Sequence, residues 1–183
     1  MDIRVEKTER AIKQAFMELR AQRPVEKIRV KELCDLAQIN KSTFYAHYQD
    51  IYALESTLEG ELVEDVLDGL GTLKPSDFYE RTDWLTQELF RAFGQNAREV
   101  NILFSGSRKA LFINRLEQGL RERIMKIDPA FWEDPMRSIL LSFCVQGSYY
   151  SFANNSGQVD DKRLVKLLAT IARAAQNADP CLG

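Results

Sequence analysis

The sequence predicts an all-α protein with a small N-terminal domain of three helices, followed by a C-terminal helical bundle, with about nine helices in all. Apolar residues recur at helical spacing along the chain, and the alternation typical of strands is almost absent. Glycine (9 residues) and proline (5 residues) are sparse, which disfavours a turn-rich β protein. An apolar fraction of 45% and a charged fraction of 28% are ordinary globular values and disfavour wholesale disorder.

The first helix is predicted from one apolar stripe with positions i, i+3, i+4 and i+7. The stripe consists of Ile12, Ala15, Phe16 and Leu19. Thr8 is the expected N-cap, although helical character could begin earlier, at Val5. Pro24 is expected to stop this helix near Gln22.

Two short helices follow at residues 30–37 and 41–48, joined by a turn of about three residues. Asn40 is the expected N-cap of the second, and Asp50 caps a longer helix over residues 51–70. The positions that lock the two short helices together are apolar, namely Leu33, Leu36, Ala37, Ile39 and Phe44.

Five further helices are expected in the rest of the chain, separated by glycine, proline or asparagine. They cover residues 76–93, 97–104, 108–127, 135–152 and 160–176. The last two are more apolar than one buried face requires. Their apolar residues are Ile139, Leu140, Phe143 and Val145, then Leu164, Leu167, Leu168 and Ile171. We therefore expect two domains, residues 1–50 and residues 51–183.

The residues that metal binding and nucleophilic catalysis require are scarce. Cys34, Cys144 and Cys181 stand far apart, which disfavours a disulfide framework or a zinc ribbon and suits a reduced, cytoplasmic setting. His47 is the single histidine, so sites that need two histidines are excluded. We predict no catalytic residue, no metal site and no cofactor. The apolar runs are shorter than the ~20 residues of a bilayer span, and the charged N-terminus predicts no secretory signal.

Residues 30–48 have the spacing of a helix-turn-helix, whose second helix enters the major groove of DNA. The outward positions of that helix must be polar or short to approach base edges, and Lys41, Ser42, Thr43 and Ala46 meet this demand. Tyr45 and His47 are placed to donate to phosphates. Residues 1–50 carry a net charge of +2, a mild excess that is also typical of an ordinary solvated surface.

The segment IRVKELCDLAQINKSTFYAHYQDIYAL, residues 28–54, resembles the DNA-binding domain of the TetR/AcrR family of transcriptional regulators. The resemblance extends back over the first helix and covers roughly residues 5–60. It implies base-edge contacts from Lys31, Lys41, Ser42 and Thr43, with Lys41 on a guanine edge first among them. It also implies phosphate or sugar contacts from Arg29, Tyr45 and His47.

Three positions depart from the pattern of that family. Gln38 stands in the turn where glycine is usual, and a left-handed backbone there costs a non-glycine residue about 1 kcal/mol. Arg29 occupies a position that is usually a Ser or Thr cap. Ile51 replaces a lysine that usually reaches a phosphate. These departures bear on DNA affinity and operator preference, and the expected fold is unchanged.

The resemblance further implies a homodimer through the last two long helices, a pseudo-palindromic operator and a pocket in the bundle. A small, largely apolar effector would suit such a pocket. The pocket candidates are the aromatic residues Trp84, Phe104, Phe143 and Tyr150, with Asn101 and Arg108 as polar partners.

The function predicted from the sequence is therefore a DNA-binding regulator, most often a repressor in such a family, that a small molecule releases from its operator. An activator of the same architecture stays open. A different class also stays open, a helical protein-interaction adaptor that has lost operator binding. An enzyme would require a catalytic cluster that the sequence does not display.

Overall fold

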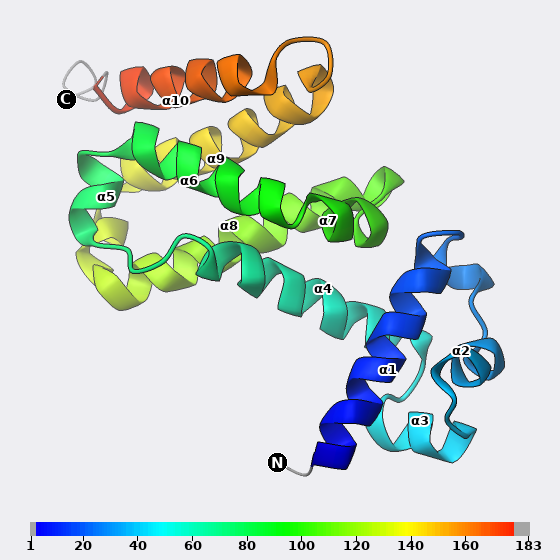
Figure 1. Cartoon of the computed structure of the whole chain (residues 1–183). Helices are drawn as coiled ribbons and strands as arrows, with labels where there is room; N and C mark the ends of the chain where they lie inside the picture. The colour runs from blue at the N-terminus through cyan, green and yellow to red at the C-terminus, as the bar shows by residue number, and fades with distance from the viewer. Residues whose placement is uncertain (1–2, 178–183) are drawn as a thin grey trace. The chain divides into compact units, whose positions relative to one another are not determined.

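The protein is helical throughout residues 3–177, the part that the computed structural model describes (Figure 1). No extended strand occurs among these residues, so the all-α prediction is confirmed. The α-helices are α1 (Ile3–Arg20), α2 (Val30–Ala37), α3 (Lys41–His47), α4 (Ile51–Asp68), α5 (Pro75–Tyr79), α6 (Thr82–Gln95), α7 (Ala97–Leu103), α8 (Lys109–Ile127), α9 (Pro135–Asn155) and α10 (Asp161–Asn177). The 3-10 helices are η1 (Val25–Lys27), η2 (Gly106–Arg108) and η3 (Pro129–Glu133). Measured against the thickness of a bilayer, each described helix is too short or too polar to span it. Cys181 lies outside the described residues.

The helices near the turn begin where local signals predict. α2 has the predicted bounds, and Asn40 caps α3 by accepting a hydrogen bond of 2.8 Å from the Thr43 amide. Asp50 Oδ1 accepts one of 2.7 Å from the Ala53 amide in the first turn of α4. Caps of this kind typically contribute ~1 kcal/mol, so these two side chains define where α3 and α4 start.

Two predicted boundaries are wrong. Thr8 is not an N-cap, because α1 begins at Ile3 and the Thr8 hydroxyl donates a hydrogen bond of 2.9 Å to the Arg4 carbonyl inside the helix. The single helix expected over residues 76–93 is divided into α5 and α6, which raises the number of described α-helices to ten. Asp77, which is buried, accepts a 2.8 Å hydrogen bond from the Lys74 amide and so caps α5 as a separate turn.

The described chain forms two compact units. The first contains Arg98–Arg108 and the described part of Met1–Leu62. The second contains Val63–Ala97 and the described part of Lys109–Gly183. The division falls within α4, so this helix contributes residues to both units. The functional boundary expected at residue 50 stays a prediction.

In the first unit, α1, α2 and α3 enclose an apolar core. Its side chains that are 0% exposed include Ile12, Phe16, Leu33, Phe44 and Leu54. The predicted apolar stripe of α1 is therefore confirmed, but the inward orientation predicted for Leu36 is wrong, since that residue is 45% exposed. Leu33 and Cys34 form the buried face of α2. Leu36 is rotated by about 200° from Cys34 about the helix axis, so it lies away from Cys34.

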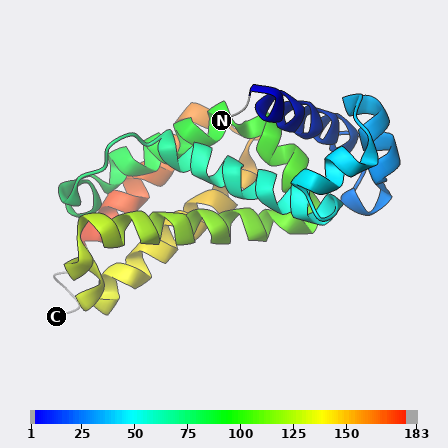
Figure 2. The same cartoon turned by 90° about the horizontal axis from the view of Figure 1, so that it is seen from below.

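In the second unit, α6 packs on α10 and α8 packs on α9 (Figures 1 and 2). Phe112, Leu120 and Ile124 of α8 are 0% exposed and form the centre of this core. Gly69, just after α4, is in close contact with α6. A Cβ atom built on Gly69 would lie 2.9 Å from the Ala92 Cβ, so a larger residue there would push the two segments apart.

The apolar residues named for α9 and α10 are buried or exposed, except Leu140, which is half-buried. Val145, Leu164 and Leu168 are buried within the unit. Ile139, Phe143, Leu167 and Ile171 are 61%, 59%, 55% and 45% exposed. These two helices are thus more apolar than the packing of the second unit uses, as the sequence predicts.

Candidate nucleic-acid interface and candidate ligand cavity

A left-handed residue makes the turn between α2 and α3. Gln38 has φ 56° and ψ 42°, and the following Ile39 amide donates a hydrogen bond of 3.0 Å to the Cys34 carbonyl. This arrangement is a helix C-cap of the type that usually employs glycine. It ends α2 and leaves three residues before α3 begins at Lys41, the connection of a helix-turn-helix.

Phe44 and Tyr48 anchor α3 to its unit. They are 0% and 8% exposed, and their ring centroids lie 6.0 Å apart. The core positions predicted for both residues are confirmed. Burial raises the pKa of Tyr48 to about 12, so its hydroxyl stays protonated and can donate to Glu9 at 3.5 Å.

The opposite face of α3 is open. Lys41, Ser42, Tyr45 and Ala46 are exposed, and Tyr45 is 56% exposed despite its large ring. Thr43 and His47 are half-buried at the edge of this face. The structure therefore brings five of the seven predicted DNA-contact residues onto one short helix.

Two hydroxyls on α3 are already engaged as donors. Ser42 Oγ and Thr43 Oγ1 donate to Asn40 Oδ1 at 2.7 and 2.8 Å. A hydroxyl that donates its hydrogen still has lone pairs that can accept. While these bonds persist, both residues present acceptors to solvent, whereas Lys41 presents donors.

Arg29 and Lys31 lie at the beginning of α2, where both are exposed. Arg29 occupies the N-cap position without a side-chain capping hydrogen bond, as its chemistry predicts. Tyr52, near the start of α4, is 57% exposed and was not among the predicted site residues.

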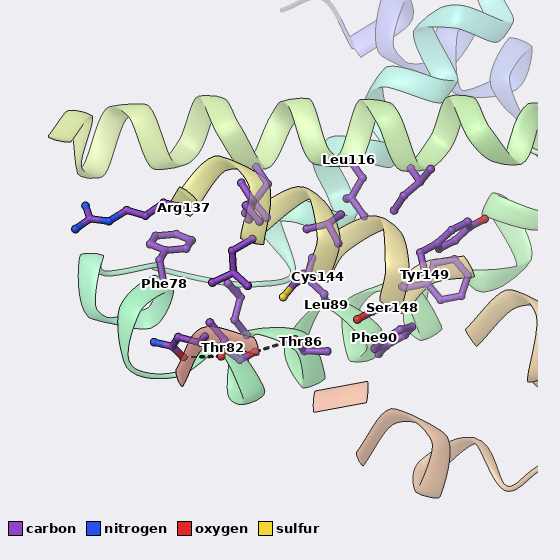
Figure 3. Close-up of a pocket in the computed structure, with 18 of the residues that line it drawn as sticks. Phe78, Thr82, Thr86, Leu89, Phe90, Leu116, Arg137, Cys144, Ser148 and Tyr149 are labelled. Atoms are coloured by element: carbon purple, nitrogen blue, oxygen red, sulfur yellow. Dashed lines mark hydrogen bonds between the residues drawn. The ribbon is translucent and has the colours of Figure 1, made fainter. Parts of the chain in front are cut away.

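A second candidate site is a cavity of about 600 Å³ in the second unit, within the usual range for small-molecule pockets. Most of the side chains that line it come from α6, α8 and α9, and α5, η3 and α10 contribute the others (Figure 3). Three of these form an aromatic cluster, since the Phe112 ring lies 5.9 Å from Phe93 and 5.8 Å from Tyr149. Cys144 also lines the cavity, and burial raises the pKa of its thiol to about 11.

None of the six predicted pocket residues is among those that line this cavity. Phe143 and Tyr150 are 59% and 41% exposed, whereas the adjacent residues Cys144 and Tyr149 line the cavity. One residue along a helix is about 100° of rotation, so Phe143 and Tyr150 lie on a different side of α9 from Cys144 and Tyr149, and their role in ligand binding stays a prediction.

The other four predicted pocket residues lie elsewhere. Trp84 is half-buried, with the Arg81 guanidinium 4.4 Å from its ring centre. Asn101, Phe104 and Arg108 belong to the first unit, where Asn101 is exposed, Phe104 is buried and Arg108 pairs with Glu59. A role of these residues in ligand binding stays a prediction.

The fold and this geometry define an all-α chain that carries a helix-turn-helix and an apolar cavity. No family model matches the sequence, and no curated protein matches it. Among solved structures, the chain is similar to a TetR family transcription regulator from Marinobacter aquaeolei VT8. That similarity has 17% sequence identity and a TM-score of 0.43, and it covers 96% of this chain and 98% of the other.

Proposed function

We propose that this protein is a dimeric, TetR-like transcriptional regulator that binds a pseudo-palindromic operator and is released from it by a small molecule. The observation that carries the proposal is the exposed polar face of α3, held by a capped helix-turn-helix in a chain of the expected all-α class. We expect such a regulator to act in the cytoplasm, where it can reach DNA.

In this proposal α3 enters the major groove. Lys41 donates to a guanine edge, and Ser42 and Thr43 accept from base amino groups or from a bridging water. Tyr45 and His47, together with Arg29, contact phosphates and fix the register of the helix. Lys31, at the start of α2, is a further base-edge candidate.

The dimer is proposed to form through α9 and α10. Their outward apolar side chains, including Phe143 and Leu167, cost free energy while they remain in water, and a second copy would bury them. A two-fold axis between copies places two α3 helices at successive major grooves, which predicts a palindromic operator.

Release is proposed to occur by population shift. DNA favours one spacing of the two α3 helices, and an effector in the cavity favours another. A coupling of about 1–3 kcal/mol would weaken operator binding roughly 5–150-fold. The helix α4 is the proposed carrier of this shift, because its residues belong to both units.

Selection of the purified protein against random duplex DNA, followed by titration of the selected sequence at several salt concentrations, tests the proposal. We expect a pseudo-palindrome. The double variant Lys41→Ala/Tyr45→Ala should lose at least about tenfold in affinity for it, which a lost base contact and a lost phosphate contact would explain. Lys126→Ala, which removes an exposed lysine from α8, is the matched control and should bind like wild type.

Enrichment of no sequence, with weak binding that vanishes smoothly as salt rises, would contradict operator recognition. The adaptor interpretation would then stand. If an operator is found, transcription from a reporter that carries it distinguishes repression, which we expect, from activation.

A further inference from the structure

The cavity in the second unit offers an ionised ligand no charge that lacks a partner. Its described lining contains no aspartate or glutamate, so a cation would find no carboxylate there. Arg137 is the one cation of the described lining, and it already pairs with Asp134, whose Oδ2 lies 3.4 Å from its Nε. Burying an ion without a partner of opposite charge is costly. The cavity therefore favours a neutral ligand over a cation or an anion.

Two other titratable groups of the lining are uncharged near pH 7. Burial raises the pKa of the Cys144 thiol to about 11, and it also raises the pKa of the Tyr149 hydroxyl above its ordinary value of 10. Neither group therefore attracts a counter-ion at this pH. Most of the remaining lining is apolar and includes Leu89, Phe90 and Leu116. A ligand that fills this space is expected to have an apolar body.

The hydroxyl groups of the lining differ in the hydrogen bonds that they form. Thr82 Oγ1 donates to Gln176 Oε1 at 2.7 Å, and Thr86 Oγ1 donates to the Thr82 carbonyl at 2.7 Å. The Ser148 hydroxyl, in contrast, forms no hydrogen bond with any residue that the structure describes. Ser148 lies one turn after Cys144 on α9, and Figure 3 shows it pointing toward α6. Because a serine hydroxyl can both donate and accept, Ser148 offers a ligand one uncharged polar partner.

We propose that the cavity binds a neutral, largely apolar molecule that carries one hydroxyl or carbonyl oxygen. This oxygen forms a hydrogen bond with the Ser148 hydroxyl, while the apolar body packs against Leu89 and Leu116 and reaches the aromatic cluster. The inference rests on the proposed function, since it names the chemical class of the effector, but its test uses the purified protein without DNA.

Isothermal titration calorimetry at pH 7 with 2-naphthol, 2-naphthoate and 2-naphthylmethylammonium compares three probes that share one ring system and differ in charge. 2-Naphthol should bind at least about tenfold more tightly than either ion, because its burial leaves no charge without a partner. Equal binding of the three probes, a preference for either ion, or binding of none of them would overturn the inference.

The role of Ser148 is tested by substitution and by a fourth probe, naphthalene, which lacks the oxygen. Ser148→Ala should weaken the binding of 2-naphthol about fivefold, as expected for the loss of one hydrogen bond, and should leave the binding of naphthalene unchanged. Ser151→Ala, which alters an exposed serine of the same helix, is the matched control and should bind both probes like wild type. An unchanged affinity of Ser148→Ala for 2-naphthol, or an equal loss for both probes, would contradict the proposed hydrogen bond.

Alkylation read by peptide mass spectrometry locates the ligand without any substitution. 2-Naphthol should slow the alkylation of Cys144, which lines the cavity, and should leave that of Cys34 in α2 unchanged. An unprotected Cys144 would show that the probe binds elsewhere and would overturn the inference. Failure to recover an operator would overturn the proposed function alone.

Discussion

Arg20 Nε donates a hydrogen bond of 2.9 Å to Glu55 Oε1, and the two side chains are only 6% and 2% exposed. This ion pair joins α1 to α4 inside the first unit. Arg108 of η2 approaches the same glutamate at 3.4 Å and also pairs with Glu59, which is 1% exposed. Two arginines and two glutamates thus hold three segments of the unit, and their charges balance.

The first prediction concerns this pair. Arg20→Ala leaves Glu55 buried with one cation fewer, and breaking a buried pair from one side typically costs 3–5 kcal/mol. We expect a loss of about 3 kcal/mol in the free energy of unfolding, measured by urea denaturation followed by far-UV circular dichroism. Arg98→Ala, at an exposed arginine of α7, should change it by less than about 0.5 kcal/mol. Equal effects of the two substitutions would show that the buried pair does not stabilise the unit.

The second prediction concerns the turn. Gln38→Gly should raise the free energy of unfolding by about 0.5–1 kcal/mol. Glycine removes the strain of the left-handed backbone, and this gain exceeds the free-energy cost of the more flexible unfolded chain. Gln22→Gly is the control, since Gln22 is exposed and lacks a positive φ, and it should give no gain. Urea denaturation of both variants measures this. A loss of stability in Gln38→Gly would mean that the Gln38 side chain contributes contacts that outweigh the strain.

The third prediction concerns pH. Burial raises the pKa of Glu117, but hydrogen bonds from Ser142 (2.7 Å), Gln146 (2.6 Å) and Arg121 outweigh it and hold the pKa below its ordinary value of 4.5. The ionised carboxylate therefore stabilises the fold above pH 4.5, and this contribution is lost as the pH falls through the lowered pKa.

Glu117→Gln should accordingly lose about 1.5–3 kcal/mol of unfolding free energy at pH 7, the usual contribution of hydrogen bonds to a charged group. Its deficit relative to wild type should shrink on acidification below pH 4.5. Urea denaturation between pH 7 and pH 3 measures both. Glu122→Gln, an exposed neighbour on α8, serves as the control. A deficit that is constant across this range would exclude the carboxylate charge as its source.

The fourth prediction concerns the proposed dimer. Phe143→Glu places a charge on the exposed apolar face of α9 and should convert the dimer to a monomer in sedimentation velocity measurements. Operator affinity should fall with it, because one copy reaches only one half-site. Met125→Glu alters a residue of α8 that is 49% exposed, outside the proposed interface, and should leave the dimer intact. A Phe143→Glu protein that remains dimeric would place the interface elsewhere.

The predictions that depend on neighbouring residues along the chain are mostly confirmed. The bounds of α2, the caps Asn40 and Asp50 and the departure at Gln38 all depend on groups three or four residues apart, and the structure confirms them. One local signal, Thr8, led to a wrong prediction, because the same side chain can form a different hydrogen bond. Thr8 resembles an N-cap, yet its hydroxyl bonds within the helix.

The sequence by itself determined the helical class, the helix-turn-helix and the excess of apolar residues on α9 and α10, because periodicity and capping act within a few residues along the chain. Tertiary structure decided which way those helices face. It turned Leu36 and Phe143 to the solvent and Cys144 and Tyr149 to the cavity. Rotation of a helix about its axis is chosen by the partners that pack against it, and those partners come from distant parts of the chain.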